Sequence, residues 1–325
     1  MQRDSLPSVA RGGEPGSRSS FALVALVALL AIALFVSACG SSSEKSIVLT
    51  IGARATPEEE ILGHLYVDAL RRAGFKAKGM FGIEPEPREA TLQELKAGRI
   101  SGYPDHVDTA LEDFFSVSSE SLPKQAQEAY RDATTALEKE GLTALPPTPY
   151  SRNRRLAMLR TTAEAHSLET ISDLRGQSEK MTMSGPTDCH FAADCLAGFE
   201  RFYHVYFESI SYTYTDKEVR ERFKVLQDGR FDASIVNNTD GQLAKNDEFV
   251  LLEDDKHVLP AGNVIFVTSL KVVEEAGEDF ERAIAAAQKG LTLPVIQRLD
   301  AEVELEKKSA AEVAADYLKG VKLSG

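Results

Sequence analysis

The chain has 325 residues, 43% of them hydrophobic and 27% charged, which is the composition of a globular protein and enough length for two domains. The formal net charge is −13, and no stretch concentrates lysine and arginine. A nucleic-acid partner is therefore excluded as a main function, and the acidity favours solubility instead.

The N-terminal segment contains an unbroken apolar run of 16 residues at 21–36, preceded by a region with three arginines. This run is shorter than the roughly 20 residues that a spanning helix needs, so it is typical of a signal peptide. The small residues before Cys39 make this stretch resemble the lipobox of bacterial lipoproteins. The resemblance implies that residues 1–38 are removed and that Cys39 carries a lipid.

A single uncleaved membrane anchor is the alternative interpretation of the same segment. Both interpretations put the rest of the chain outside the cytoplasm, at the extracytoplasmic face of the cell membrane. Residues 39–46 are rich in serine and predict a polar tether between the lipid and the folded part.

Besides Cys39, the chain contains two cysteines, Cys189 and Cys195. In an oxidising compartment such a pair favours a disulfide. His190 next to Cys189 keeps a metal site as an alternative, although two cysteines and one histidine do not make the closed four-ligand set of a structural zinc site.

The first elements of the folded part predict a β-α-β unit. Residues 46–52 form a short apolar, β-branched run typical of a buried strand. Thr56 then suits a helix N-cap, Pro57 the first helical position, and Glu59 completes a capping box. A second extended run follows at 75–81, so a parallel sheet begins here.

Strands and helices alternate through the remainder of the chain. We expect further strands at 100–104, 155–159, 231–236, 249–253 and 263–269. We expect further helices at 88–96, 107–115, 122–141, 168–176, 195–206, 216–229, 274–291 and 309–318.

Two extended segments, at 151–160 and 260–269, bracket a middle block with its own strands, helices and cysteines. This order predicts an α/β protein of two lobes joined by two crossing segments. The expected boundaries are 47–150 for the first part of lobe 1, 151–261 for lobe 2 and 262–325 for the return to lobe 1. Ligands prefer the crevice between such lobes.

Five motifs occur in order between residues 47 and 320. They are GARATPE at 52–58 with ILG at 61–63, GRISGYPDHVDT at 98–109, CHFAADCLAGF at 189–199, NTDGQL at 238–243 and LEDDK at 252–256. Together they resemble the substrate-binding proteins of ABC transporters for glycine betaine, choline and related quaternary amines. The pattern of that family at 98–109 is G-x-I-D-x-Y-P-E-Y-T-G-T.

The resemblance implies a two-lobe periplasmic-binding-protein fold of type II and a role in capturing an osmoprotectant. The loaded protein would deliver its solute to a membrane permease driven by a separate ATPase. The sequence has no phosphate-binding loop, dinucleotide fingerprint, HExxH or nucleophile elbow, so we expect no enzyme activity, cofactor or metal.

The resemblance also implies a set of ligand-binding residues. A quaternary ammonium donates no hydrogen bond and is held by aromatic faces. Tyr103 matches a cage tyrosine of the family, and Tyr214 falls near a second one, where Tyr212 competes with it. Arg54 takes the position of a lysine in the first strand-to-helix turn, where a carboxylate could bind.

The same motifs add Thr56, Asn238 and Thr239 to the predicted ligand-binding residues. Asn237 departs from the family, which has an aromatic residue before this motif. An amide there provides hydrogen bonds instead of an aromatic wall. A more polar, non-quaternary solute is therefore an alternative ligand.

Two other functions stay open at this point. One is the same fold acting as a sensor or scaffold without a transport partner. The other is an exported enzyme that uses a pair such as Asp240 with His257, although the sequence shows no spacing of nucleophile and base.

Overall fold

The computed structural model describes residues 47–84, 87–214, 219–245 and 247–320. Of residues 213, 214, 219 and 220 it describes the backbone and not the side chains. The chain divides into the units 1–43 and 44–325, and all described residues belong to the second. The predicted signal peptide, Cys39 and the tether lie outside the described residues. None of the helices in the described part combines the length and apolar character needed to cross a membrane.

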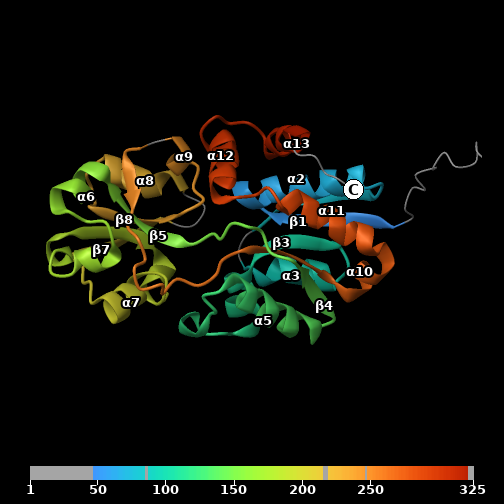
Figure 1. Cartoon of the computed structure of the whole chain (residues 1–325), viewed down its shortest axis with the longest axis horizontal. Coiled ribbons are helices and arrows are strands. Elements are labelled where there is room, and N and C mark those ends of the chain that lie inside the picture. The colour runs from blue at the N-terminus through green and yellow to red at the C-terminus, as the bar shows by residue number, and fades with distance from the viewer. Residues whose placement is uncertain (1–46, 85–86, 215–218, 246, 321–325) are drawn as a thin grey trace, which may run out of the picture. The chain divides into compact units, whose positions relative to one another are not determined.

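The first of two sheets has the strand order β2-β1-β3-β10-β4 (Figure 1). Its strands are β1 (Val48–Arg54), β2 (Lys76–Ile83), β3 (Gly102–His106), β4 (Leu142–Leu145) and β10 (Val264–Ser269). β1 pairs in parallel with β2 and β3, which confirms the predicted β-α-β start. β10 returns from far along the chain and runs antiparallel between β3 and β4. Because β1 and β3 are parallel, their carboxyl ends meet at one edge of this sheet.

The second sheet has the strand order β7-β6-β8-β5-β9. Its strands are β5 (Arg154–Leu159), β6 (Thr182–Pro186), β7 (Ser209–Tyr214), β8 (Ala233–Asn237) and β9 (Phe249–Leu251). β6 is parallel to β7 and β8, and β5 is antiparallel to β8 and β9. The chain passes between the two sheets twice, once after β4 and once after β9, which confirms the predicted α/β class with two lobes.

Helices of both lobes cover their sheets (Figure 1). In lobe 1 they are α2 (Pro57–Arg72), α3 (Glu89–Lys96), α4 (Val107–Thr109), α5 (Ala126–Glu138), α10 (Leu270–Ala276), α11 (Glu278–Gln288), α12 (Leu293–Glu304) and α13 (Ala310–Gly320). In lobe 2 they are α6 (Arg160–His166), α7 (Leu196–Gly198), α8 (Val219–Gln227) and α9 (Gln242–Lys245). Separate apolar clusters form on the two faces of the first sheet, and every residue of β3 is buried.

The C-terminal part of lobe 1 differs from the sequence-based expectation. The helix expected over 274–291 is two helices, α10 and α11, because Gly277 between them has a φ of +72° that interrupts the helix. The sequence analysis also missed α12, which begins after Thr292 and has a proline in its first turn. This omission matters because α12 carries two acidic residues of the site described below.

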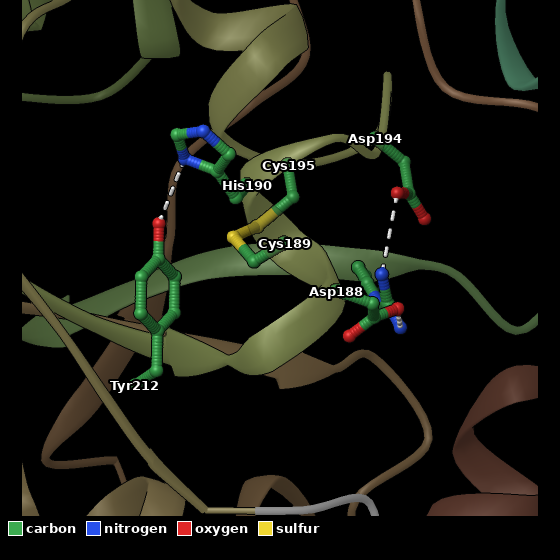
Figure 2. Close-up of a disulfide and its surroundings, with 7 residues drawn as sticks. Asp188, Cys189, His190, Asp194, Cys195 and Tyr212 are labelled. Carbon is green, nitrogen blue, oxygen red and sulfur yellow. Dashed lines mark hydrogen bonds and ion pairs between the residues drawn. A yellow bond between two sulfur atoms is a disulfide. The ribbon is translucent and has the colours of Figure 1, made fainter.

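Cys189 and Cys195 form a disulfide, as predicted (Figure 2). It closes a loop of seven residues at the end of β6. His190 in this loop points toward Tyr212, and its Nδ1 lies 3.1 Å from the tyrosine hydroxyl. The metal alternative is not supported, because the described residues contain no group of histidine, cysteine and acidic side chains that could hold a metal ion.

Candidate functional site

A cavity of about 700 Å³ is lined by residues of both lobes. Its walls come from the carboxyl ends of β1, β3, β6 and β8, from α12 and from the first crossing segment. Among the described residues, eight acidic side chains and four arginines line it, and no phenylalanine or tyrosine does. The acidic side chains are Glu58, Glu59, Glu89, Asp113, Asp188, Asp240, Asp300 and Glu304, and the arginines are Arg54, Arg88, Arg152 and Arg222.

Arg54 ends β1 and is only 1% exposed. Its Nε donates to Glu59 at 2.9 Å, and its Nη2 donates to Asp105 of the neighbouring parallel strand at 2.5 Å. Burial alone would lower the pKa of the Arg54 guanidinium, but the charges of Asp105 and Glu59 raise it overall. Arg54 is therefore part of a buried ion triad, and only its Nη1 has no hydrogen-bond partner among the described residues.

Glu59 has a different role from the one expected. Thr56 caps α2 as predicted, with its hydroxyl accepting from the Glu59 amide at 3.4 Å. The Glu59 carboxylate, however, does not complete a capping box. It accepts from the backbone N–H and the Nε of Arg54, whose buried guanidinium requires a carboxylate partner, while the Thr56 N–H donates to the Arg54 carbonyl at 2.8 Å.

Glu58 connects the two lobes. Its carboxylate accepts a hydrogen bond from Tyr150 at 2.9 Å and from Thr239, which follows β8 of lobe 2, also at 2.9 Å. His106 Nε2 lies 3.1 Å from the same carboxylate. Burial alone would raise the pKa of Glu58, but the hydrogen bond and charge of His106, with Arg152 and Tyr150, lower it to about 2. Glu58 is therefore ionised at neutral pH, and His106 Nε2 must carry the donated proton.

Asn237 ends β8 and is surrounded by guanidinium groups. With its side-chain oxygen turned toward them, it accepts from Arg152 at 2.8 Å and from Arg222 at 2.7 Å. Arg222 also pairs with Asp240 at 3.2 Å, and both side chains are buried. The Asn237 amide thus holds two arginines in place at the cavity wall.

Two carboxyl groups of α12 complete the lobe 1 side of the cavity. Burial raises the pKa of Glu304 to about 7, with a further contribution from the charge of Asp240. Burial likewise raises the pKa of Asp300, and the charges of Glu58, Glu304 and Asp240 add to this effect. Both residues lie on one face of α12 because they are four positions apart.

Gly241 brings lobe 2 into close contact with this face of α12. Its backbone N–H donates to Glu304 at 3.3 Å. A Cβ atom at this position would lie 2.6 Å from the Cα of Ala301 and 2.8 Å from the carbonyl carbon of Asp300. Only glycine fits at position 241, where the backbone of lobe 2 contacts the backbone of α12.

The structure brings four of the predicted ligand-binding residues together at the cavity. These residues are Arg54, Thr56, Asn237 and Thr239. Asn238 does not line the cavity. Its side-chain oxygen accepts from the Asn153 amide at 2.8 Å and its Nδ2 donates to the Ser151 carbonyl at 2.9 Å, so it holds the first crossing segment against lobe 2.

One of the two predicted cage tyrosines, Tyr103, is not among the lining residues. Tyr103 lies in β3 with no exposed surface and packs in the apolar cluster with Ile265, Val267 and Leu111. Its position therefore gives no support to a role in binding. The side chain of Tyr214 lies outside the described residues, so its role stays a prediction.

Sequence reasoning missed Glu58, His106, Arg152, Arg222 and the two acids of α12. A signal existed for two of them. Glu58 stands in the first motif, and His106 stands where the family pattern at 98–109 has its second tyrosine. Arg222 has no motif around it, and it reaches the cavity only because α8 packs beside β8.

The pair of Asp240 and His257 is not brought together. Asp240 is buried and paired with Arg222, whereas His257 is exposed and does not line the cavity. The described residues therefore give no support to an enzyme built on this pair.

Comparisons with known proteins agree with the fold. A family model described as the substrate binding domain of ABC-type glycine betaine transport systems matches residues 48–320. A crystal structure titled as a glycine betaine/carnitine/choline ABC transporter superposes with a TM-score of 0.74, covering 84% of this chain and 98% of that chain at 19% identity. Apo YehZ from Escherichia coli superposes with a TM-score of 0.70, covering 86% of this chain and all of that chain at 21% identity.

Two curated proteins are similar in sequence. The ergothioneine transport permease/ergothioneine binding protein of Helicobacter pylori is 26% identical over 300 residues, which are 91% of this chain and 51% of that protein. The chain thus spans about half the length of that relative. The glycine-betaine-binding protein of Pseudomonas aeruginosa is 23% identical over 292 residues, covering 83% of this chain and 87% of that protein.

Proposed function

Because the chain belongs to the family of substrate-binding domains of ABC-type glycine betaine transport systems, we propose that its cavity captures a small amine solute for an ABC permease. The solute carries a positive charge and an oxygen acceptor, and a separate ATPase drives its import. The observation that carries this proposal is the cavity of about 700 Å³ lined by both lobes, with acidic residues in excess.

The charges of the cavity support a cationic group on the solute. In the part of the chain that the structure describes, eight acidic side chains and four arginines line the cavity, and the carboxylates of Glu59 and Asp105 already compensate Arg54. A cation entering this field is attracted, and an anion without a cationic group is repelled.

An acceptor on the solute is supported by Arg54. Its Nη1 is buried at the cavity wall without a hydrogen-bond partner among the described residues, and such a donor is costly to leave unsatisfied. A carboxylate or carbonyl oxygen of the solute would satisfy it. Thr56, Asn237 and Thr239 are proposed to contact the solute around this point.

The solute proposal is tested with the full-length protein in detergent. Thermal unfolding would be followed with glycine betaine, choline, carnitine and non-methylated amines, and lactate would serve as the anionic control. We expect at least one amine to raise the free energy of unfolding by about 2.7 kcal/mol at a concentration of roughly 100 times its Kd. Stabilisation by lactate and by none of the amines would contradict the proposal.

Attachment to the membrane is proposed to occur through a lipid on Cys39, outside the cytoplasm. Cys39→Ala is expected to abolish lipidation and to leave the protein unprocessed or released. Ser41→Ala in the tether is the matched control and should stay at the membrane. A Cys39→Ala protein that still resists carbonate extraction would show that the apolar segment itself is the anchor.

A further inference from the structure

Among the described residues, one carboxyl oxygen of Asp300 at the cavity has no hydrogen-bond partner. Asp300 on α12 is 2% exposed and lines the cavity, and its Oδ1 has no hydrogen-bond partner among the described residues. A buried carboxyl oxygen without a donor costs free energy that a folded protein normally recovers through a hydrogen bond. The missing donor is therefore expected to come from what the cavity binds.

The charged groups around Asp300 favour a cation. Glu58 faces it from α2, Glu304 from the next turn of α12 and Asp240 from the segment after β8. Arg152, on the crossing segment, is a cation that acts on Asp300. It also lies 3.9 Å from Glu58 and donates to Asn237 at 2.8 Å. Among the described side chains, carboxyl groups thus outnumber guanidinium groups around Asp300, so an additional cation is favoured there.

The kind of cation follows from the hydrogen bond that Asp300 lacks. A quaternary ammonium presents only methyl groups and is held by aromatic faces. No phenylalanine or tyrosine lines the cavity among the described residues, whereas an N–H donor would satisfy Oδ1 directly. We propose that Asp300 is the recognition point for an ammonium, amidinium or guanidinium group with at least one N–H, and that this protein prefers such solutes over quaternary amines. The inference rests on the proposed function, since it specifies the solute of the same cavity.

The role proposed for Asp300 makes solute binding depend on pH. Burial and the neighbouring carboxylates raise the pKa of Asp300, so its proton competes with the incoming cation. Binding of the cation to the carboxylate releases that proton to solvent. Affinity for the solute should therefore increase with pH, and calorimetry in buffers of different ionisation enthalpy should detect proton release.

The test compares two series of amines that differ only in N-methylation, together with one guanidinium compound. Full-length protein in detergent would be titrated with glycine, sarcosine, dimethylglycine and glycine betaine, with ethanolamine and choline, and with methylguanidinium. We expect the N–H forms to bind at least about tenfold more tightly than the quaternary member of their series. Asp300→Asn should remove most of this preference, and Asp316→Asn, an exposed aspartate of α13, is the matched control.

The outcomes separate the inference from the proposed function. If glycine betaine or choline binds most tightly and Asp300→Asn leaves its affinity unchanged, the inference is wrong and the proposed function stands. If none of the amines binds, both are wrong. A folded Asp300→Asn protein is expected, because the change removes a buried carboxyl group. Proton release by the wild-type protein is an independent readout, and its absence on binding an N–H solute would also overturn the inference.

Discussion

Arg54→Ala is expected to lower the free energy of unfolding by about 3–5 kcal/mol. The change leaves Asp105 and Glu59 buried without their shared cation, and a buried charge that loses its partner is strongly destabilising. Chemical denaturation at pH 7 would measure the loss. Arg99→Ala, which removes an exposed arginine paired with Glu94, is the matched control and should change stability little.

The same variant separates two roles for Arg54. Sequence reasoning predicted a ligand-binding arginine, whereas the geometry gives it a buried structural triad with one free donor. A variant with unchanged stability and lost solute affinity would show that the ligand role dominates and that the triad contributes little. The stability of Arg54→Lys is expected to lie between those of the wild type and Arg54→Ala. A planar guanidinium binds Glu59 and Asp105 through different nitrogens, whereas the single ammonium of a lysine cannot reach both.

Glu58→Gln is expected to lower the free energy of unfolding at pH 7 by about 3 kcal/mol. In the folded protein the pKa of Glu58 is about 2, below its ordinary value of 4.5. A lowered pKa means that the ionised form stabilises the fold, so this contribution is complete above pH 4.5 and is lost as the pH falls toward 2. Unfolding measured between pH 3 and pH 7 should therefore show a smaller pH dependence for Glu58→Gln than for the wild type.

A matched variant isolates the bond between the lobes. Thr239→Val removes the hydroxyl that donates to Glu58 and should cost about 1 kcal/mol, with a smaller change in the pH dependence than Glu58→Gln. Equal effects of Glu58→Gln and Thr239→Val at every pH would contradict the assignment of the larger effect to the buried negative charge.

Local sequence signals predicted the beginning of the fold well. Thr56 and Pro57 mark the start of α2, and the β-branched run before them becomes β1. These features depend on neighbours within one turn or one strand, which a single sequence displays directly. The disulfide could also be predicted from the sequence. Cys189 and Cys195 are close in sequence, and the N-terminal segment predicts an oxidising compartment outside the cytoplasm.

The direction of side chains was less predictable. Tyr103 stands in a matching motif, but every residue of β3 is buried, so the motif does not tell which face of the strand meets the cavity. Asp300 and Glu304 were missed for another reason. They occur in an acidic stretch that is typical of an exposed helix. In the folded protein the segment after β8 and helix α2 pack against α12, which buries Asp300 and half-buries Glu304.

The contact between Gly241 and α12 also bears on how long a solute stays bound. The atoms that a side chain at 241 would meet belong to the backbone, so no flexible side chain could move aside. A side chain at 241 is therefore expected to keep lobe 2 from this approach to α12 and so to weaken the binding of any solute that contacts both lobes.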